Sequence, residues 1–254
     1  MTDADDDAPA LLLVHGLFGS LSAPFVVDAF DPRRTLAPDL LGYGALAHED
    51  LSGLRLEDQA DHLAATLDDE GVERADVAGH SVGGAVAVLL AARHPDRVRA
   101  LVSVEGNLTP PDAFWSAELA GRSLDEIELM VEDYRRDVAG WIAAAGVVPT
   151  RERVRVAAQW LDDQPAATLR AQARAVVEAT GREDYLGDLR AALEDGLALH
   201  LVAGERSRSG WHVPADVENA ARSSTTVPGC GHLMMLESPE GFAAAVTGAI
   251  AADA

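Results

Sequence analysis

The stretch VAGHSVGGAVAVLLAARHP, residues 77–95, places Ser81 in a Gly-x-Ser-x-Gly motif between an apolar run and a helix-like run. The motif predicts a sharp turn from a strand into a helix, in which Gly79 and Gly83 let the two backbones approach. A glycine-rich turn with a helix-capping serine has the same pattern, so the motif alone leaves both interpretations open. Because a serine hydroxyl is a poor nucleophile at neutral pH, a catalytic Ser81 also requires an activating base elsewhere in the chain.

Around this motif, short apolar runs alternate with longer segments of helical periodicity. Such alternation is typical of βαβ units that build a parallel sheet buried on both faces. The predicted strands cover residues 10–15, 34–38, 75–79, 99–104, 197–203 and 223–227. The predicted helices around them cover residues 22–30, 56–70, 82–94, 215–222 and 239–252, the last with Ser238 as its N-cap and Pro239 in its first position.

The interval from 107 to 192 breaks this alternation, because it holds helical patterns such as SLDEIELMVEDYRRDVAGWIAAAG with no strand between them. We interpret it as a helical cap inserted after the fourth strand. The chain then divides into an α/β core, residues 1–106 and 193–254, and a cap, residues 107–192. Open α/β sheets bind ligands beyond the carboxyl ends of their strands, so functional side chains are expected in the loops that follow strands, under the cap.

The composition suits one large α/β domain and narrows the classes of partner. The chain has 254 residues, of which 48% are hydrophobic, enough for a sizeable core. A net charge of −22 argues against binding to nucleic acid or to anionic membranes, both of which require basic patches. The chain has a single cysteine, Cys230, which fits a reducing compartment. It shows no apolar run of bilayer length and no basic leader, so we expect a cytoplasmic protein. No histidine, cysteine and carboxylate set has metal-ligand spacing, so no metal site is expected.

Two further segments give the motif a context. LLLVHGLFGS, residues 11–20, ends the first predicted strand with His15-Gly16, and VPGCGHLMMLESPEGF, residues 227–242, holds Gly231-His232 after the last one. With these three motifs in this order, the chain resembles the α/β-hydrolase family, specifically its serine esterase-like members with a helical cap. The resemblance implies a mostly parallel sheet flanked by helices. The antiparallel strands that usually precede the first motif are missing, which predicts a sheet trimmed at that edge.

Site residues follow from the resemblance, position by position. It makes Ser81 the nucleophile and His232 the general base that takes the serine proton during attack and returns it to the leaving group. The backbone N–H groups of Leu17 and Val82 would form the oxyanion hole. Neither a metal nor a cofactor is implied.

The carboxylate that orients His232 is less clearly marked. Most of the family carries it as Gly-x-x-Asp after the penultimate strand, where this chain has Ser207 instead. We favour Glu105 in ALVSVEGNL, residues 100–108, because it ends an apolar strand where a buried carboxylate requires a partner. Certain lactonases and haloalkane dehalogenases are similar in placing a glutamate there. Glu205 and Asp216 stay open as alternatives, as does a site without an acid.

Several other residues are candidates for contacts with a substrate. They share a position next to one of the motifs or at the start of the cap, and are Phe18, His80, Asn107, Trp115 and Met234. Large apolar residues at helical spacing are more often part of the core than in contact with a ligand. Asn107 could instead cap a turn at the start of the cap.

These motifs predict a serine hydrolase that cleaves a small, largely apolar carboxylic ester or lactone through an acyl-enzyme. A C–C hydrolase, a thioesterase or a cofactor-free perhydrolase could use the same residues, because fold and triad do not determine the substrate. A non-catalytic small-molecule receptor is the alternative from another functional class. Dehalogenation and epoxide hydrolysis are disfavoured, since those members of the family have an aspartate at the position of Ser81.

Overall fold

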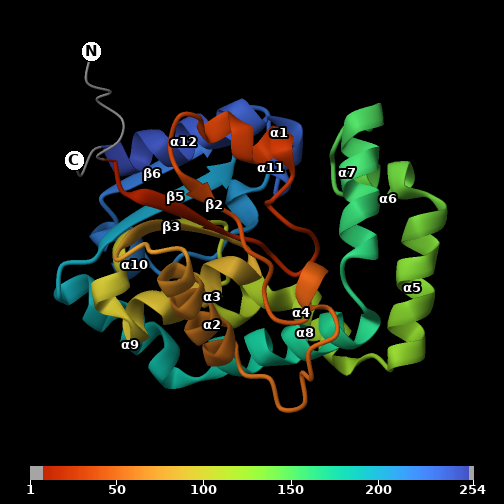
Figure 1. Ribbon diagram of the computed structural model, residues 1–254, viewed down its shortest axis with the longest axis horizontal. Helices are drawn as coiled ribbons and strands as arrows, with labels where there is room; N and C mark the ends of the chain where they lie inside the picture. The colour runs from red at the N-terminus through yellow and green to blue at the C-terminus, as the bar shows by residue number, and fades with distance from the viewer. Residues whose placement is uncertain (1–7, 252–254) are drawn as a thin grey trace.

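In the computed structural model, which describes residues 8–251, six parallel strands form one sheet in the order β2-β1-β3-β4-β5-β6 (Figure 1). The strands are β1 (Ala10–Val14), β2 (Thr35–Leu36), β3 (Ala75–His80), β4 (Val98–Val104), β5 (Ala198–Gly204) and β6 (Ser223–Val227). Each agrees with its predicted segment to within one residue at either end, except that β2 ends two residues early. The expected α/β-hydrolase sheet, parallel throughout the described residues, is confirmed.

Burial of the strands follows from their position in the sheet. Every residue of β1, β3 and β5 is buried, as expected for central strands that are covered on both faces and read as near-continuous apolar runs. The edge strand β6 has the sequence SSTTV, and only its last residue is buried. The carboxyl ends of the strands meet at one edge of the sheet. The motif residues lie just after β1, β3 and β6 at this edge, and Glu105 lies just after β4.

Helices cover both faces of the sheet. The helix α12 lies against β4, β5 and β6 on one face, together with α1, while α3 lies against β1, β3 and β4 and is flanked by α2 and α9 (Figure 1). The α-helices are α1 (Pro24–Val27), α2 (Leu56–Asp69), α3 (Val82–Arg93), α4 (Phe114–Gly121), α5 (Leu124–Arg136), α6 (Val138–Ala144), α7 (Arg151–Asp162), α8 (Ala166–Gly181), α9 (Glu183–Glu194), α10 (Ala215–Ala220), α11 (Met234–Glu237) and α12 (Pro239–Ala251). The 3₁₀ helices are η1 (Asp28–Phe30), η2 (Gly44–Leu46), η3 (Pro95–Arg97), η4 (Pro110–Ala113) and η5 (Arg208–Gly210).

Side-chain caps define where several helices begin. The Ser123 hydroxyl accepts a hydrogen bond from the backbone N–H of Glu126, whose carboxylate accepts from the N–H of Ser123, so α5 starts with a complete capping box. The hydroxyl of Ser238 accepts from the N–H of Gly241, which confirms it as the cap of α12. The predicted helix 239–252 extends one position beyond the described residues. The segment predicted as a helix over 22–30 is divided between α1 and η1.

The regular elements of the insertion between β4 and β5 are all helices. Residues 105–197 are all described and contain no strand. The helix α8 packs against α4 and α5, whereas α9 lies along α3, and α5, α6 and α7 stand beside the sheet in Figure 1. The division into a core and a cap at residues 106 and 192 stays a prediction.

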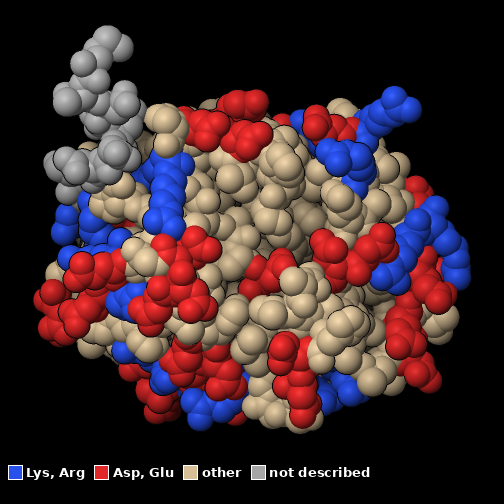
Figure 2. All heavy atoms as spheres, viewed as in Figure 1, with Lys and Arg blue, Asp and Glu red and all other residues tan. Residues whose placement is uncertain are grey.

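Many charged side chains lie on the face of the molecule drawn in Figure 2, mostly around an uncharged centre. Figure 2 shows acidic side chains gathered in several clusters on the face viewed, with arginines between them. Among residues 8–251, no helix is both long enough and apolar enough to cross a membrane.

Candidate active site

Ser81 lies at the apex of the turn that joins β3 to α3. Its backbone has φ 54° and ψ −120°, a strained conformation for a residue with a side chain. The turn is secured by three backbone hydrogen bonds: Ser81 N–H donates to Val104 O at 3.0 Å, and Ser81 O accepts from Gly84 at 2.9 Å and from Asn107 at 3.0 Å. Contacts with the helix and with the loop after β4 therefore maintain the strained backbone. In this conformation the Ser81 hydroxyl extends beyond the edge of the sheet.

The glycines of the motif are required by close backbone approach. A Cβ atom on Gly79 would lie 2.4 Å from the carbonyl oxygen of Gly83, and one on Gly83 would lie 2.3 Å from the carbonyl oxygen of Val14. A Cβ on Gly84 would lie 2.4 Å from Cα of Gly106, on the loop that carries Glu105. Since backbone atoms surround these positions, no side-chain movement could relieve the overlap.

Replacing Gly83 by alanine is expected to lower the free energy of unfolding by about 3 kcal/mol or more, because the added methyl group overlaps β1. Gly187 in α9 is a matched control, since a Cβ there meets no atom within 4 Å. Gly187→Ala should leave the protein as stable or stabilise it by about 1 kcal/mol through helix propensity. Chemical denaturation of both variants measures the difference, and a Gly83→Ala variant as stable as the wild type would contradict the packing argument.

A second group of residues meets beside this turn. His232 lies in the loop between β6 and α11, and its Nδ1 is 2.6 Å from Oε2 of Glu105, which follows β4. Because a carboxylate only accepts, Nδ1 carries the proton and donates it, leaving Nε2 of neutral His232 free to accept. The Glu105 side chain is only 5% exposed, whereas that of His232 is 44% exposed.

The Glu105 carboxylate is held in its charged form by its partners. Burial raises its pKa, but the hydrogen bond and charge of His232, and hydrogen bonds from Ser207 and Gly204, outweigh burial and hold the pKa below its ordinary value. Oε1 accepts from the Ser207 hydroxyl at 2.5 Å and from the Gly204 N–H at 2.7 Å. The backbone of Glu105 also has a positive φ, 43°, so the residue that ends β4 is strained as Ser81 is.

The alternative carboxylates are engaged elsewhere. Glu205 is exposed and accepts from the N–H of Gly229 at 2.7 Å. Asp216 forms an exposed ion pair with Arg190 at 2.5 Å. Of the three candidates, the structure therefore brings only Glu105 to His232.

The loop after β1 lies directly against Ser81. A Cβ atom on Gly16 would lie 3.2 Å from Cβ of Ser81, so the next residue, Leu17, is close to the nucleophile turn. Val82 is the first residue of α3, where backbone N–H groups have no partner within the helix. The two predicted oxyanion-hole donors thus belong to segments that meet at Ser81.

Two side chains distant in sequence brace this loop. The Tyr43 hydroxyl donates to the carbonyl oxygen of Leu17 at 3.0 Å. The N–H of Gly19 donates to Oε1 of Gln164, between α7 and α8, at 3.1 Å, and both residues are buried. No local pattern marked Tyr43 or Gln164, because each acts through a contact with a segment elsewhere in the chain. The motif position of Ser207 drew attention to it, but its contact with Glu105, 102 positions away, is not visible in the sequence.

His80 is buried beneath the loop that carries His232. Its Nε2–H donates to the carbonyl oxygen of His232 at 2.9 Å, and the two ring centroids lie 4.5 Å apart. Burial, with the charge of His232, lowers the pKa of His80 to about 3. His80 is therefore neutral near pH 7 and supports the backbone of His232.

The other predicted substrate contacts differ in exposure. Phe18 packs edge-on against Trp115 of α4, with ring centroids 5.5 Å apart, and Trp115 is 43% exposed. Asn107 is 2% exposed, and its carbonyl oxygen accepts from the Tyr185 hydroxyl at 2.8 Å. Met234 is fully buried. Only Phe18 and Trp115 combine partial exposure with mutual contact, and substrate binding by all these residues stays a prediction.

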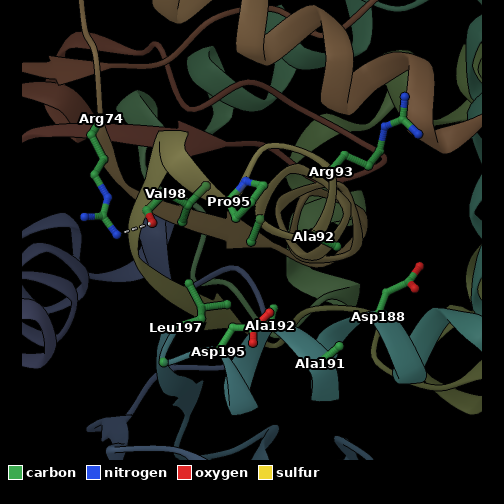
Figure 3. Close-up of a pocket in the computed structure, with 12 residues that line it drawn as sticks. Arg74, Ala92, Arg93, Pro95, Val98, Asp188, Ala191, Ala192, Asp195 and Leu197 are labelled. Carbon is green, nitrogen blue, oxygen red and sulfur yellow. Dashed lines mark hydrogen bonds between the residues drawn. The ribbon is translucent and has the colours of Figure 1, made fainter.

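A surface cavity of about 370 Å³ lies elsewhere in the fold (Figure 3). It is lined by Val98 at the start of β4, by Leu197 just before β5 and by Asp188 of α9, and Arg74 donates a hydrogen bond to the Val98 carbonyl there. This is the amino end of the strands, opposite the end that carries Ser81, and is not where open α/β sheets bind their substrates. Within residues 8–251, no group of three histidine, cysteine or carboxylate side chains is arranged to hold a metal ion.

The chain is similar to several known hydrolases. The family model described as "Alpha/beta hydrolase family" matches residues 11–245. The chain is 35% identical over 97 residues to 2-hydroxymuconate semialdehyde hydrolase of Pseudomonas sp. (strain CF600), covering 36% of this chain and 34% of that protein. It is 31% identical over 128 residues to Lipase 3 of Moraxella sp. (strain TA144), covering 48% and 39%.

The alignments thus span little more than a third of the length of these curated relatives. Among solved structures, the fold is similar to a loop variant of the haloalkane dehalogenase DbeA from Bradyrhizobium elkanii, with a TM-score of 0.71 and 22% identity. That match covers 98% of this chain and 92% of the other. At this level of identity the match establishes the shared fold.

Proposed function

Because the chain belongs to the α/β-hydrolase family, we propose that it is a serine hydrolase that cleaves a small, largely apolar carboxylic ester or lactone. The observation that carries the proposal is the 2.6 Å contact between His232 Nδ1 and Glu105, beside a strained serine turn. This contact leaves His232 Nε2 as a base on the side away from Glu105. The sequence resemblance supports the same three residues in the same roles.

In the proposed reaction, His232 Nε2 takes the hydroxyl proton of Ser81 as the serine oxygen attacks the substrate carbonyl. The N–H groups of Leu17 and Val82 stabilise the negative charge that develops on the carbonyl oxygen. Collapse of the tetrahedral intermediate breaks the bond to the alcohol, which takes the proton from His232. Water, deprotonated by His232, then cleaves the acyl-enzyme by the same steps in reverse.

Glu105 stabilises the imidazolium that forms in each step and holds the ring in the tautomer with the proton on Nδ1. Its negative charge and its two donors on Oε1 fit this task. Acyl transfer by these groups requires neither a metal nor a cofactor.

A second candidate is hydrolysis of a C–C bond next to a carbonyl. It is favoured by the similarity to 2-hydroxymuconate semialdehyde hydrolase, and the same triad residues could serve it. The two candidates differ in the leaving group, which is an alkoxide in one and a carbanion in the other.

Intact-mass analysis after incubation with a fluorophosphonate tests the serine mechanism, and one stoichiometric adduct is expected. Turnover of p-nitrophenyl esters and aliphatic lactones is then compared with turnover of a 2-hydroxy-6-oxo-dienoate. Faster cleavage of the dienoate would favour the C–C hydrolase. No adduct on folded protein would favour a small-molecule receptor with this fold.

The brace on the oxyanion loop gives a separate prediction. Gln164→Met removes the acceptor for the Gly19 N–H, so the Leu17 N–H should be less well positioned for the transition state. We expect kcat for p-nitrophenyl acetate to fall about tenfold, less than the loss of a whole oxyanion donor would cause, with KM little changed. Gln159→Met, on the exposed side of α7, is the control and should have no effect. A fall in Gln159→Met as large as in Gln164→Met would show that the brace is irrelevant.

A further inference from the structure

Ser207 occupies the position three residues after Gly204 at which the resemblance leads one to expect an aspartate. In the structure, its side chain forms a hydrogen bond. Its hydroxyl lies 2.5 Å from Oε1 of Glu105, and a second acceptor, the carbonyl oxygen of Gly204, is farther away at 3.4 Å. A distance of 2.5 Å is typical of a hydroxyl that donates to a charged carboxylate.

We propose that Ser207 is a positioning residue of the active site, which holds the Glu105 carboxylate so that Oε2 faces His232 and its charge is stabilised. This inference rests on the proposed function and adds a residue to it. The hydrogen bonds divide the carboxylate: Oε1 takes the Ser207 hydroxyl and the Gly204 N–H, and Oε2 takes His232. Each oxygen thus has its own partners, and rotation of the carboxylate would break all three bonds.

The serine and the glutamate form a matched pair. An aspartate at position 207 would place a second negative charge against the buried Glu105 carboxylate, and like charges so close cannot both stay ionised. A serine at the same position supplies a proton donor. One explanation therefore accounts for both residues. The acid lies after β4 in this chain, and the position where an aspartate is expected holds a serine that donates a hydrogen bond to it.

The role makes a prediction about pH, because Ser207 stabilises one protonation state of the Glu105–His232 pair. The pair carries a net negative charge when His232 is neutral and no net charge when His232 is protonated. The Ser207 hydrogen bond favours the negative state, so its removal should make the pair bind a proton more tightly. His80 also interacts electrostatically with Glu105, and with a pKa of about 3 it stays neutral over the relevant range.

The experiment compares four proteins, namely the wild type, Ser207→Ala, Ser207→Thr and Ser209→Ala. The pH dependence of kcat/KM is measured with p-nitrophenyl acetate, and His232 is titrated in each protein by NMR of its ring. Ser209 is exposed on the same loop and is the matched control. In Ser207→Ala, the acidic limb of the profile and the His232 midpoint should move up by about half a pH unit to one unit. Its kcat at neutral pH should fall about tenfold.

Ser207→Thr keeps the hydroxyl and should titrate as the wild type does, as should Ser209→Ala. A merely structural role for Ser207 would lower activity at every pH and leave the midpoint in place, which would overturn the inference. A shift in Ser207→Thr equal to that in Ser207→Ala would overturn it too. If the wild type neither hydrolyses the ester nor reacts with a fluorophosphonate, the proposed function is wrong. The NMR titration requires no turnover, so it still tests whether Ser207 stabilises the Glu105 carboxylate.

Discussion

Replacing Ser81 by alanine is expected to lower kcat for p-nitrophenyl acetate by about 10⁴-fold to 10⁶-fold, the range seen when a triad nucleophile is lost. The reason is that the oxyanion-hole donors and His232 would stay in place but no group could form the acyl-enzyme. The fluorophosphonate adduct should disappear from the mass spectrum. The fold should be retained, because the backbone hydrogen bonds of the turn do not involve the hydroxyl.

Ser224→Ala is the control for this variant. Ser224 is an exposed serine on the edge strand β6, so its replacement should change neither turnover nor labelling. Circular dichroism and thermal unfolding of both variants establish that they are folded. If folded Ser81→Ala kept more than a tenth of the wild-type rate, the acyl-enzyme mechanism would have to be abandoned.

Glu105→Gln is expected to have the second largest effect, a loss of about 10³-fold to 10⁴-fold in kcat, comparable to an aspartate-to-asparagine change in another serine triad. Two donors, the Ser207 hydroxyl and the Gly204 N–H, point at Oε1, so the amide oxygen of glutamine should take that place. Its NH₂ group would then face His232 Nδ1. Nδ1 would have to accept, the ring proton would move to Nε2, and His232 could not take the proton of Ser81.

Glu205→Gln and Asp216→Asn are the controls, because both residues are carboxylates that the sequence left open as the acid. Neither variant should lower kcat more than about threefold, since both side chains are exposed and paired elsewhere. Steady-state kinetics at neutral pH, with unfolding midpoints for all three variants, measure the contrast. A larger loss in either control than in Glu105→Gln would transfer the orienting role to that residue.

The fold could be predicted from the sequence because its signals are local. Short runs of apolar or β-branched residues predict the six strands, and a parallel α/β sheet follows from their alternation with helices. The turn at Ser81 also has a local signal, since a Cβ atom on Gly79 would meet backbone atoms of Gly83 and Gly84 in the same turn. Only for β2 does a predicted boundary differ by more than one residue, because a two-residue edge strand gives a weak sequence pattern.

The partners of the site depend on contacts that no local pattern contains. Glu105 and His232 are 127 positions apart, and Gly19 and Gln164 are 145 apart. Glu105 and Glu205 directly follow strands and Asp216 lies in α10, between β5 and β6, and the sequence alone could not exclude any of them. Which of these carboxylates contacts His232 depends on how the loops after the strands lie once β4, β5 and β6 are side by side.

Strand, helix and turn preferences act over a few residues, so the α/β sheet, the sharp turn at Ser81 and the loop that carries His232 could be predicted without knowledge of distant contacts. Tertiary structure alone decided that Glu105 meets His232, that Ser207 donates to Glu105 and that Gln164 supports the loop of Leu17. The physical reason is that a hydrogen bond between distant segments forms only where packing brings a donor and an acceptor within about 3 Å. The order of strands in the sheet sets those distances.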